Sequence, residues 1–217
     1  MLAAPRTSMQ IDDLITALAT NGFVIAQDFV DAELVARLLD DCRHHEATGA
    51  MARASIGRDE QHLLEARVRH VDASWLDGSR PAEAAFLELA ERLRLEINRQ
   101  LYLGLFEFEA QFLTYPPGGF YQRHLDSLAG SRNRVVSLVA YLNSDWEPSH
   151  GGELDVWSSP SDEGDPVATV APRAGTIVLM LSEEVPHAVR AANEVRRVIA
   201  GWFRVNASSA NRIDPAR

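Results

Sequence analysis

A histidine and an aspartate stand two positions apart at the end of a turn-rich stretch, Thr114–Asp126, and both residue types are common metal ligands. If the chain around them is extended, the two-residue period of a strand places His124 and Asp126 on one face, with Leu125 opposite. A second imidazole from elsewhere would complete the facial triad that holds Fe(II) and leaves three coordination positions open. His187 is our candidate for this third ligand.

The His-x-Asp triplet alone is weak evidence, because the chain contains seven histidines and many aspartates. A second such triplet, from His70 to Asp72, precedes a turn and a helix that begins near Pro81, so we interpret its polar residues as part of a surface strand. The first triplet is followed instead by a polar turn (127–133) and the apolar run 135–142. That order is typical of a metal site carried by a strand within a sheet.

The composition restricts the classes of partner and the compartment. A chain of 217 residues fits one domain, which we place at 1–205 with a polar tail at 206–217. The net charge of −10 and the lack of a Lys/Arg-rich run argue against nucleic acid as the main partner. No apolar run is long enough for a membrane span and the N-terminus lacks signal-peptide features, so we expect a cytoplasmic protein without membrane contact. The sequence leaves the oligomeric state unknown.

Helical periodicity is confined to the first half of the chain. Residues 11–18, 31–49 and 81–101 show apolar residues at helical spacing, and the lone cysteine, Cys42, takes an apolar position in the second of these helices. We expect His44 and His45, at the polar end of that helix, to be solvated.

Alternating and apolar strand patterns follow from residue 105. The sequence therefore predicts an α+β fold, with 1–104 as a helical support region with edge strands and 105–205 as a double-sheet barrel.

Several short motifs follow one another in a fixed order over nearly the whole chain. They are Tyr115-Pro-Pro-Gly, Arg123-His-Leu-Asp, Tyr141-Leu-Asn-x-x-Trp, Gly151-Gly-x-Leu, Pro172-x-x-Gly, Pro186-His, and Arg196 with Trp202. Each is modest, but their order resembles the 2-oxoglutarate and Fe(II)-dependent oxygenases, in particular the prolyl-hydroxylase branch that includes the animal oxygen-sensing enzymes and their bacterial relatives. The resemblance implies a double-stranded β-helix (jelly-roll, cupin-like) core with N-terminal helices packed on the major sheet.

The resemblance also implies a catalytic metal site and its cosubstrates. His124, Asp126 and His187 match the iron ligands of the family, and 2-oxoglutarate and O2 would be consumed at the iron, with ascorbate as a further candidate cofactor. A chloride-transferring relative would have a small residue in place of Asp126. Because this chain keeps the carboxylate, the resemblance favours hydroxylation.

Two neighbouring arginines compete for the distal carboxylate of 2-oxoglutarate, which requires a buried cation. The family has its arginine nine residues after the distal histidine and six before the tryptophan, and both counts select Arg196. Strand alternation places Arg197 on the opposite face, where we interpret it as a surface charge. A slipped register would exchange the two residues.

Further residues match the cosubstrate pocket of the family. Tyr141 corresponds to a tyrosine that donates a hydrogen bond to the distal carboxylate, although a packed core tyrosine is an alternative. Tyr115 corresponds to one that lines the pocket, in a turn one residue shorter than in the animal enzymes. We expect Leu154 and Val189 to line the pocket and Trp202 to pack beside the metal.

The substrate-facing residues are less well defined by the sequence. Arg134 matches an arginine beside the substrate entrance, or it is an ordinary surface charge. Residues 50–67 stand where this branch has a mobile loop that closes over a peptide, and Gly57 and Arg58 are candidates to contact the substrate there. A solvated hairpin is the alternative for this segment.

The leading hypothesis is hydroxylation of a prolyl residue in a protein or peptide, with release of succinate and CO2. A second hypothesis keeps the chemistry and replaces the substrate with a free amino acid or small metabolite. A third is a non-catalytic barrel that binds a metal or ligand, which the full triad with its arginine and tyrosine argues against. The acidic composition disfavours a nucleic-acid demethylase.

Overall fold

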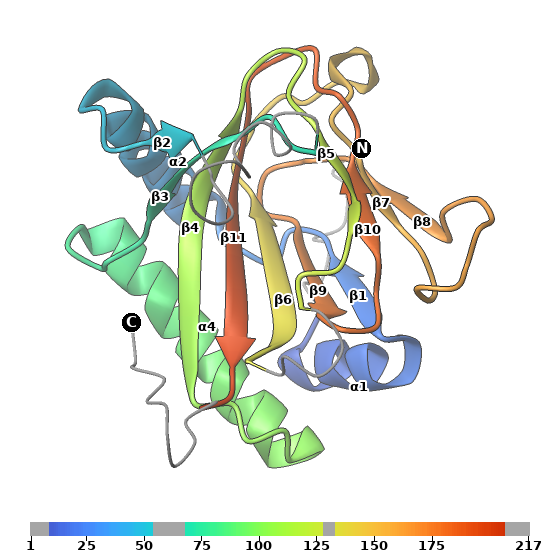
Figure 1. Cartoon of the computed structure of the whole chain (residues 1–217). Helices are drawn as coiled ribbons and strands as arrows, with labels where there is room; N and C mark the ends of the chain where they lie inside the picture. The colour runs from blue at the N-terminus through green and yellow to red at the C-terminus, as the bar shows by residue number, and fades with distance from the viewer. Residues whose placement is uncertain (1–8, 54–67, 128–132, 207–217) are drawn as a thin grey trace, which may run out of the picture.

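Two antiparallel sheets and a layer of helices make up the computed structural model, which describes residues 9–53, 68–127 and 133–206 (Figure 1). The helices are α1 (Ile11–Asn21), α2 (Ala32–Ala47), α4 (Pro81–Leu101) and the short 3-10 helix η2 (Pro148–His150). The predicted α+β class is confirmed. Gly57 and Arg58 lie outside the described residues, and so do most of the predicted substrate loop and the tail beyond Asn206.

The larger sheet has seven strands in the order β1-β9-β6-β11-β4-β3-β2. Its strands are β1 (Phe23–Ala26), β2 (Ala52–Arg53), β3 (Asp72–Trp75), β4 (Glu107–Tyr115), β6 (Arg134–Tyr141), β9 (Ile177–Leu181) and β11 (Arg196–Arg204). The smaller sheet has four strands in the order β5-β10-β7-β8. Its strands are β5 (Tyr121–His124), β7 (Leu154–Val156), β8 (Ala168–Val170) and β10 (His187–Val189).

The alternation of side chains along the central strand β11 separates two apolar clusters. Ile199 and Phe203 point into the cluster between the larger sheet and the helices, which cover one face of that sheet (Figure 1). Val198, Ala200 and Trp202 point into the cluster between the two sheets. Val198, Ala200 and Trp202 therefore line any site that lies between the two sheets. The arrangement is that of a double-stranded β-helix with helices on the major sheet, as predicted.

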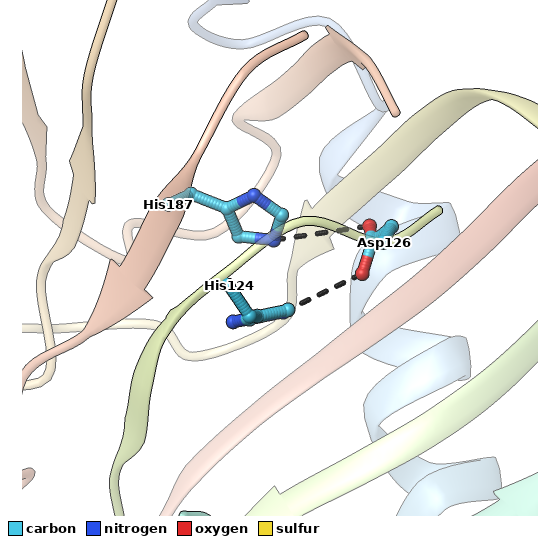
Figure 2. Close-up of side chains that lie close together, drawn as sticks. All are labelled: His124, Asp126 and His187. Carbon is cyan, nitrogen blue, oxygen red and sulfur yellow. Dashed lines mark ion pairs between the residues drawn. The ribbon is translucent and has the colours of Figure 1, made fainter. Parts of the chain in front are cut away.

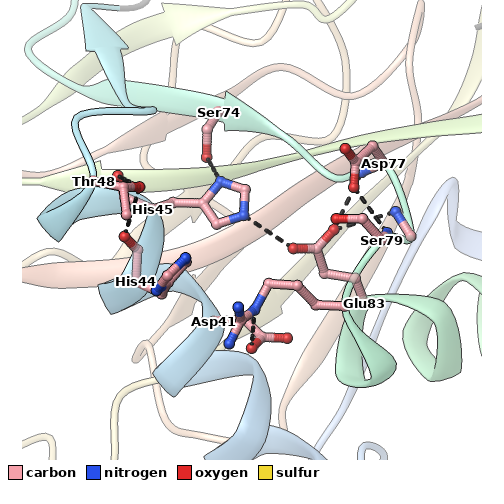
Figure 3. Close-up of polar contacts among 10 residues, drawn as sticks. Asp41, His44, His45, Thr48, Ser74, Asp77, Ser79 and Glu83 are labelled. Carbon is pink, nitrogen blue, oxygen red and sulfur yellow. Dashed lines mark hydrogen bonds and ion pairs between the residues drawn. The ribbon is translucent and has the colours of Figure 1, made fainter.

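Helix α2 is fixed to the sheet by a polar cluster that the sequence analysis did not foresee (Figure 3). His44 is exposed as expected, but the ring of His45 lies between Ser74 Oγ, at 2.9 Å from its Nδ1, and Glu83 Oε1, at 3.0 Å from its Nε2. Glu83, on α4, is fully buried, and its Oε2 accepts hydrogen bonds from the backbone N–H groups of Asp77 and Gly78, both at 3.2 Å. The expectation of a solvated His45 is wrong, because the histidine joins α2, β3 and α4.

Replacing Glu83 with alanine should lower the free energy of unfolding by about 3 kcal/mol, because two backbone donors and the imidazole lose their buried acceptor. Urea unfolding followed by circular dichroism measures the change. Glu88→Ala, at an exposed position of the same helix, is the matched control and should stay within about 0.5 kcal/mol of wild type. Equal stability of the two variants would contradict a stabilising role of the cluster.

Within the described ranges, no helix has both the length and the apolar character needed to cross a membrane.

Candidate metal centre and its pocket

Two paired strands of the smaller sheet bring the three predicted metal ligands together (Figure 2). His124 ends β5 and His187 begins β10, and the two residues are direct partners in the antiparallel register. Asp126 lies two residues beyond His124, just after the strand, with Oδ1 at 3.4 Å from His124 Nε2 and Oδ2 at 3.8 Å from His187 Nε2. One ligand atom from each side chain lies within 4.8 Å of the others, which suits a single metal ion.

The backbone fixes which nitrogen of each histidine faces the centre. The Nδ1 atoms of His124 and His187 lie 2.8 and 3.2 Å from the carbonyl oxygens of Gln122 and Val185, each two residues earlier in the chain. A carbonyl can only accept, so both Nδ1 atoms carry the proton. The unprotonated Nε2 atoms then face Asp126 and are free to bind a metal.

The charge states of the buried ligands also suit a cation. Burial alone would raise the pKa of Asp126, but the neighbouring imidazoles of His187 and His124 and the hydrogen bond from Ser137 lower it far below its ordinary value. Burial lowers the pKa of His187, because a charged imidazole is poorly solvated there, and the opposing effect of Asp126 does not restore it. An ionised carboxylate and a neutral imidazole are the forms that coordinate metal ions.

A pocket of about 530 Å³ opens from these ligands into the space between the sheets. This size lies within the range that small-molecule sites occupy, roughly 300–1,000 Å³. Its walls include Tyr115, Leu154, Val189, Arg196 and Trp202, all predicted for the pocket. These side chains are buried, so the pocket excludes much of the solvent from the metal ligands.

Arg196 places an uncompensated cation in the wall of the pocket. The side chain is 1% exposed, and its Nε and Nη1 atoms have no hydrogen-bond partner among the described residues. Its guanidinium carbon lies 4.8 Å from the ring centre of Tyr115 and 5.3 Å from that of Tyr141. Because a buried, unpaired charge is strongly unfavourable, this site fits a ligand that brings a carboxylate.

Tyr141 offers a second free donor beside Arg196. The residue is fully buried, and its hydroxyl has no partner within the part of the chain that the structure describes. Burial raises its pKa to about 12, although the positive charge of Arg196 acts in the opposite direction. Burial likewise raises the pKa of Tyr115. Tyr141 therefore keeps its proton and can donate a hydrogen bond to an anion at Arg196.

The neighbouring Arg197 faces the helices, as strand alternation requires, but it is not the surface charge that we expected. Its Nε and Nη2 atoms donate to the two carboxylate oxygens of Glu46 on α2, at 2.8 and 2.9 Å. The two arginines thus differ in their partners: Arg197 has a carboxylate within the protein, whereas Arg196 has none among the described residues.

Arg134 forms part of the outer wall of the pocket. Its Nε and Nη2 atoms donate to Glu109 Oε1 at 3.0 and 2.8 Å, and its guanidinium carbon lies 3.7 Å from the centre of the Trp202 ring. The ion pair offsets the charge of Arg134. We therefore describe Arg134 as part of a flat, preformed pocket wall and not as an isolated surface charge.

The lining residues that the sequence analysis did not propose include Arg69, Trp75, Gln111 and Tyr121. Trp75 is 40% exposed, which is unusual for a tryptophan and marks the outer rim. The ring of Tyr121 stacks on His124, with ring centres 3.5 Å apart. The alternation of Gln111 with Phe112 on β4 was a usable signal, because it places Gln111 on the face opposite the helices. His70 and Asp72 of the second triplet do not belong to the three-ligand cluster.

Comparisons with known proteins agree with this geometry. Residues 110–204 match the family model described as the 2OG-Fe(II) oxygenase superfamily. The chain is 37% identical to a prolyl-4-hydroxylase from Pseudomonas putida, with a TM-score of 0.81, and the match covers 91% of this chain and 100% of that one.

More distant structures share the fold. A prolyl hydroxylase from Trichoplax adhaerens, solved with a peptide fragment of the hypoxia inducible factor oxygen degradation domain, is 22% identical with a TM-score of 0.76, over 89% of this chain and 88% of that one. The alpha ketoglutarate dependent epimerase SnoN from nogalamycin biosynthesis is 18% identical with a TM-score of 0.64, over 95% and 93%.

Proposed function

Because the chain belongs to the 2OG-Fe(II) oxygenase superfamily and is a 2-oxoglutarate-dependent dioxygenase, we propose that it hydroxylates a prolyl residue within a protein or peptide. The observation that carries this proposal is the 37% identity to a bacterial prolyl-4-hydroxylase over the full length of that protein. The family uses Fe(II), 2-oxoglutarate and O2.

We assign the iron to His124, Asp126 and His187, whose ligand atoms lie within 4.8 Å of one another. Iron bound there would activate O2, so that oxidation of 2-oxoglutarate to succinate and CO2 is coupled to hydroxylation of a C–H bond. The protein itself supplies position and a dry environment. Asp126 provides the single negative charge of the ligand set, and the two neutral imidazoles complete it.

We assign the distal carboxylate of 2-oxoglutarate to Arg196 and Tyr141. The Nε and Nη1 atoms of Arg196 and the hydroxyl of Tyr141 are buried donors without a partner among the described residues, and an incoming carboxylate would satisfy them. The ring centre of Tyr115 lies 4.8 Å from the guanidinium carbon, and Leu154 and Val189 line the pocket with apolar surface. These residues hold the cosubstrate in one orientation and keep water away from it.

The outer part of the pocket supports a peptide as the prime substrate. Trp75, Gln111 and Arg134, all from the larger sheet, line the same pocket as the residues that we assign to iron and 2-oxoglutarate. The exposed Trp75 and the Trp202 ring under Arg134, all in the lining of this pocket, offer apolar surface for a proline ring and polar groups for its backbone. Arg58 and Gly57 stay predictions, because they lie outside the described residues.

Succinate formation tests the proposal. With Fe(II) and 2-oxoglutarate present, proline-containing peptides from candidate host proteins should stimulate succinate release, and mass spectrometry should find one added oxygen on a prolyl residue. The matched control is the same peptide with that proline replaced by alanine, which should give only the uncoupled background. Stimulation by a free amino acid or small metabolite, with none by any peptide, would contradict the proposal and favour the small-molecule alternative.

A further inference from the structure

Asp126 differs from the other two ligands in how it is held. His124 and His187 belong to paired strands, and the ladder between β5 and β10 sets their separation. Asp126 comes after the last residue of β5, so strand pairing does not restrain it. A carboxylate at the end of a strand has rotational freedom that would weaken a preformed metal site. Some other contact must fix its orientation.

We propose that Ser137 and Ser182 are positioning residues that orient the Asp126 carboxylate for metal binding. Ser137, on β6 of the larger sheet, places its hydroxyl oxygen 2.6 Å from Asp126 Oδ2. Ser182, directly after β9, places its hydroxyl oxygen 2.8 Å from that of Ser137. Both serines are 1% exposed, so water does not compete for these bonds.

The chemistry of the groups fixes the direction of this hydrogen-bond chain. A metal-binding carboxylate can only accept, so Ser137 donates its single proton to Asp126. The Ser137 oxygen must then accept from Ser182 in the second bond. A hydroxyl that accepts a hydrogen bond becomes a stronger donor, so Ser182 strengthens the bond from Ser137 to the carboxylate.

Backbone contacts of Ser182 connect it to β6 and to the segment that follows Asp126. Its N–H donates to the carbonyl of Val135 at 3.0 Å, and its carbonyl accepts from the N–H of Ser127 at 3.2 Å. Ser127 directly follows Asp126, and Ser182 precedes His187 in the segment that leads into β10. Ser182 therefore fixes the segment after Asp126 relative to β6 and to the segment that leads to His187.

This arrangement assigns different roles to the two oxygens of Asp126. Oδ2 is held by Ser137, whereas Oδ1 lies 3.4 Å from the Nε2 atom of His124 and has no serine partner among the described residues. We assign Oδ1 as the metal ligand. A carboxylate that binds through one oxygen leaves three positions open, which is the number that a chelating 2-oxo acid and O2 need.

The inference rests on the metal centre proposed above but not on the identity of the prime substrate, so it can be tested by metal binding alone. Mn(II) affinity of the purified protein is measured by calorimetry, without 2-oxoglutarate or peptide. Ser137→Ala should weaken Mn(II) binding by roughly 10- to 100-fold, the usual effect of losing an outer-shell partner. Ser182→Ala should weaken it less, because the direct bond to Asp126 remains.

The double variant separates positioning from a general loss of structure. Because Ser182 acts through Ser137, adding Ser182→Ala to Ser137→Ala should cause no further loss of Mn(II) affinity. The control is Ser74→Ala, which removes another buried serine hydroxyl, bonded to His45 and distant in the fold from the metal ligands. It should lower thermal stability and leave Mn(II) affinity unchanged.

Each negative result would contradict a different part of the proposal. Wild-type protein that does not bind Mn(II) would overturn the metal centre itself. Wild-type affinity in Ser137→Ala would overturn the positioning role alone. Additive losses from the two serine variants, or an equal loss in Ser74→Ala, would show that the hydroxyls act only through general stability and would also overturn the role.

Discussion

Replacing Asp126 with alanine should abolish 2-oxoglutarate-dependent succinate formation. The substitution removes the only carboxylate among the described residues of the three-ligand cluster, and with it the negative charge that attracts a divalent cation. Mn(II) affinity should fall by more than the roughly 10- to 100-fold that the loss of an outer-shell partner causes. Succinate release and calorimetric Mn(II) binding measure the two effects.

Asp155→Ala is the matched control for this variant. Asp155 is also a buried aspartate of the smaller sheet, but it alternates on β7 with Leu154, which faces the pocket, and bonds instead to Thr169 and Arg190. The control should lose some stability and keep both Mn(II) binding and turnover. Undiminished turnover in Asp126→Ala, or equal loss in the two variants, would contradict the assignment of Asp126 to the metal.

Replacing Arg196 with methionine should weaken 2-oxoglutarate binding by roughly 2–5 kcal/mol, because the distal carboxylate loses its buried cationic partner. This corresponds to a roughly 30-fold to several-thousand-fold higher dissociation constant. The same substitution should not lower the stability of the free protein. Methionine fills similar space without a charge, so the free protein should be as stable as wild type, or more stable by up to about 4 kcal/mol.

The adjacent Arg197→Met provides the control from the other face of the same strand. Arg197 bonds to Glu46, so its loss should lower the free energy of unfolding by about 1–3 kcal/mol and leave 2-oxoglutarate affinity unchanged. Calorimetric titration of 2-oxoglutarate in the presence of Mn(II), together with urea unfolding, measures both quantities. A weaker affinity in Arg197→Met than in Arg196→Met would show that the arginines had been assigned to the wrong faces.

The periodicity of the strands is the part of the site that the sequence predicted best. A period of two along β11 places Arg196 and Arg197 on opposite faces, and the spacing of the resembled family selected Arg196. The observed register, with Arg196 opposite Tyr115, agrees with that choice. The spacing of His124 and Asp126 also placed them on one side, although the strand ends at His124 rather than continuing through Asp126. Local spacing is sufficient to place such residues on one face of a strand, because the face depends only on neighbouring positions along the chain.

Contacts between distant segments could not be predicted in this way. The burial of His45 depends on how α2 packs against β3 and α4, and the pairing of Arg134 with Glu109 depends on the positions of β6 and β4 on either side of β11. The rim residue Trp75 depends on the register between β3 and β4. The pattern of one sequence carries no information on such registers. His45 was therefore interpreted as solvated and Arg134 as an entrance arginine or a surface charge, and Trp75 was given no role.

The serine pair shows the same limit within the site. Alternation along β6 places Ser137 on the face of Val139 and Tyr141, and both Val139 and Tyr141 belong to the cluster between the sheets. That pattern could have directed attention to a buried hydroxyl near the pocket. Its partner Ser182, however, comes from the end of β9, and only the folded arrangement brings the two hydroxyls to Asp126.

A crystal structure of the protein grown with Mn(II) and 2-oxoglutarate in the absence of oxygen tests the central claim most directly. We expect one metal ion bound by the Nε2 atoms of His124 and His187 and by Oδ1 of Asp126, with the distal carboxylate of 2-oxoglutarate on Arg196 and Tyr141. A metal ion bound by other residues, or a 2-oxoglutarate whose distal carboxylate lies away from Arg196, would contradict it.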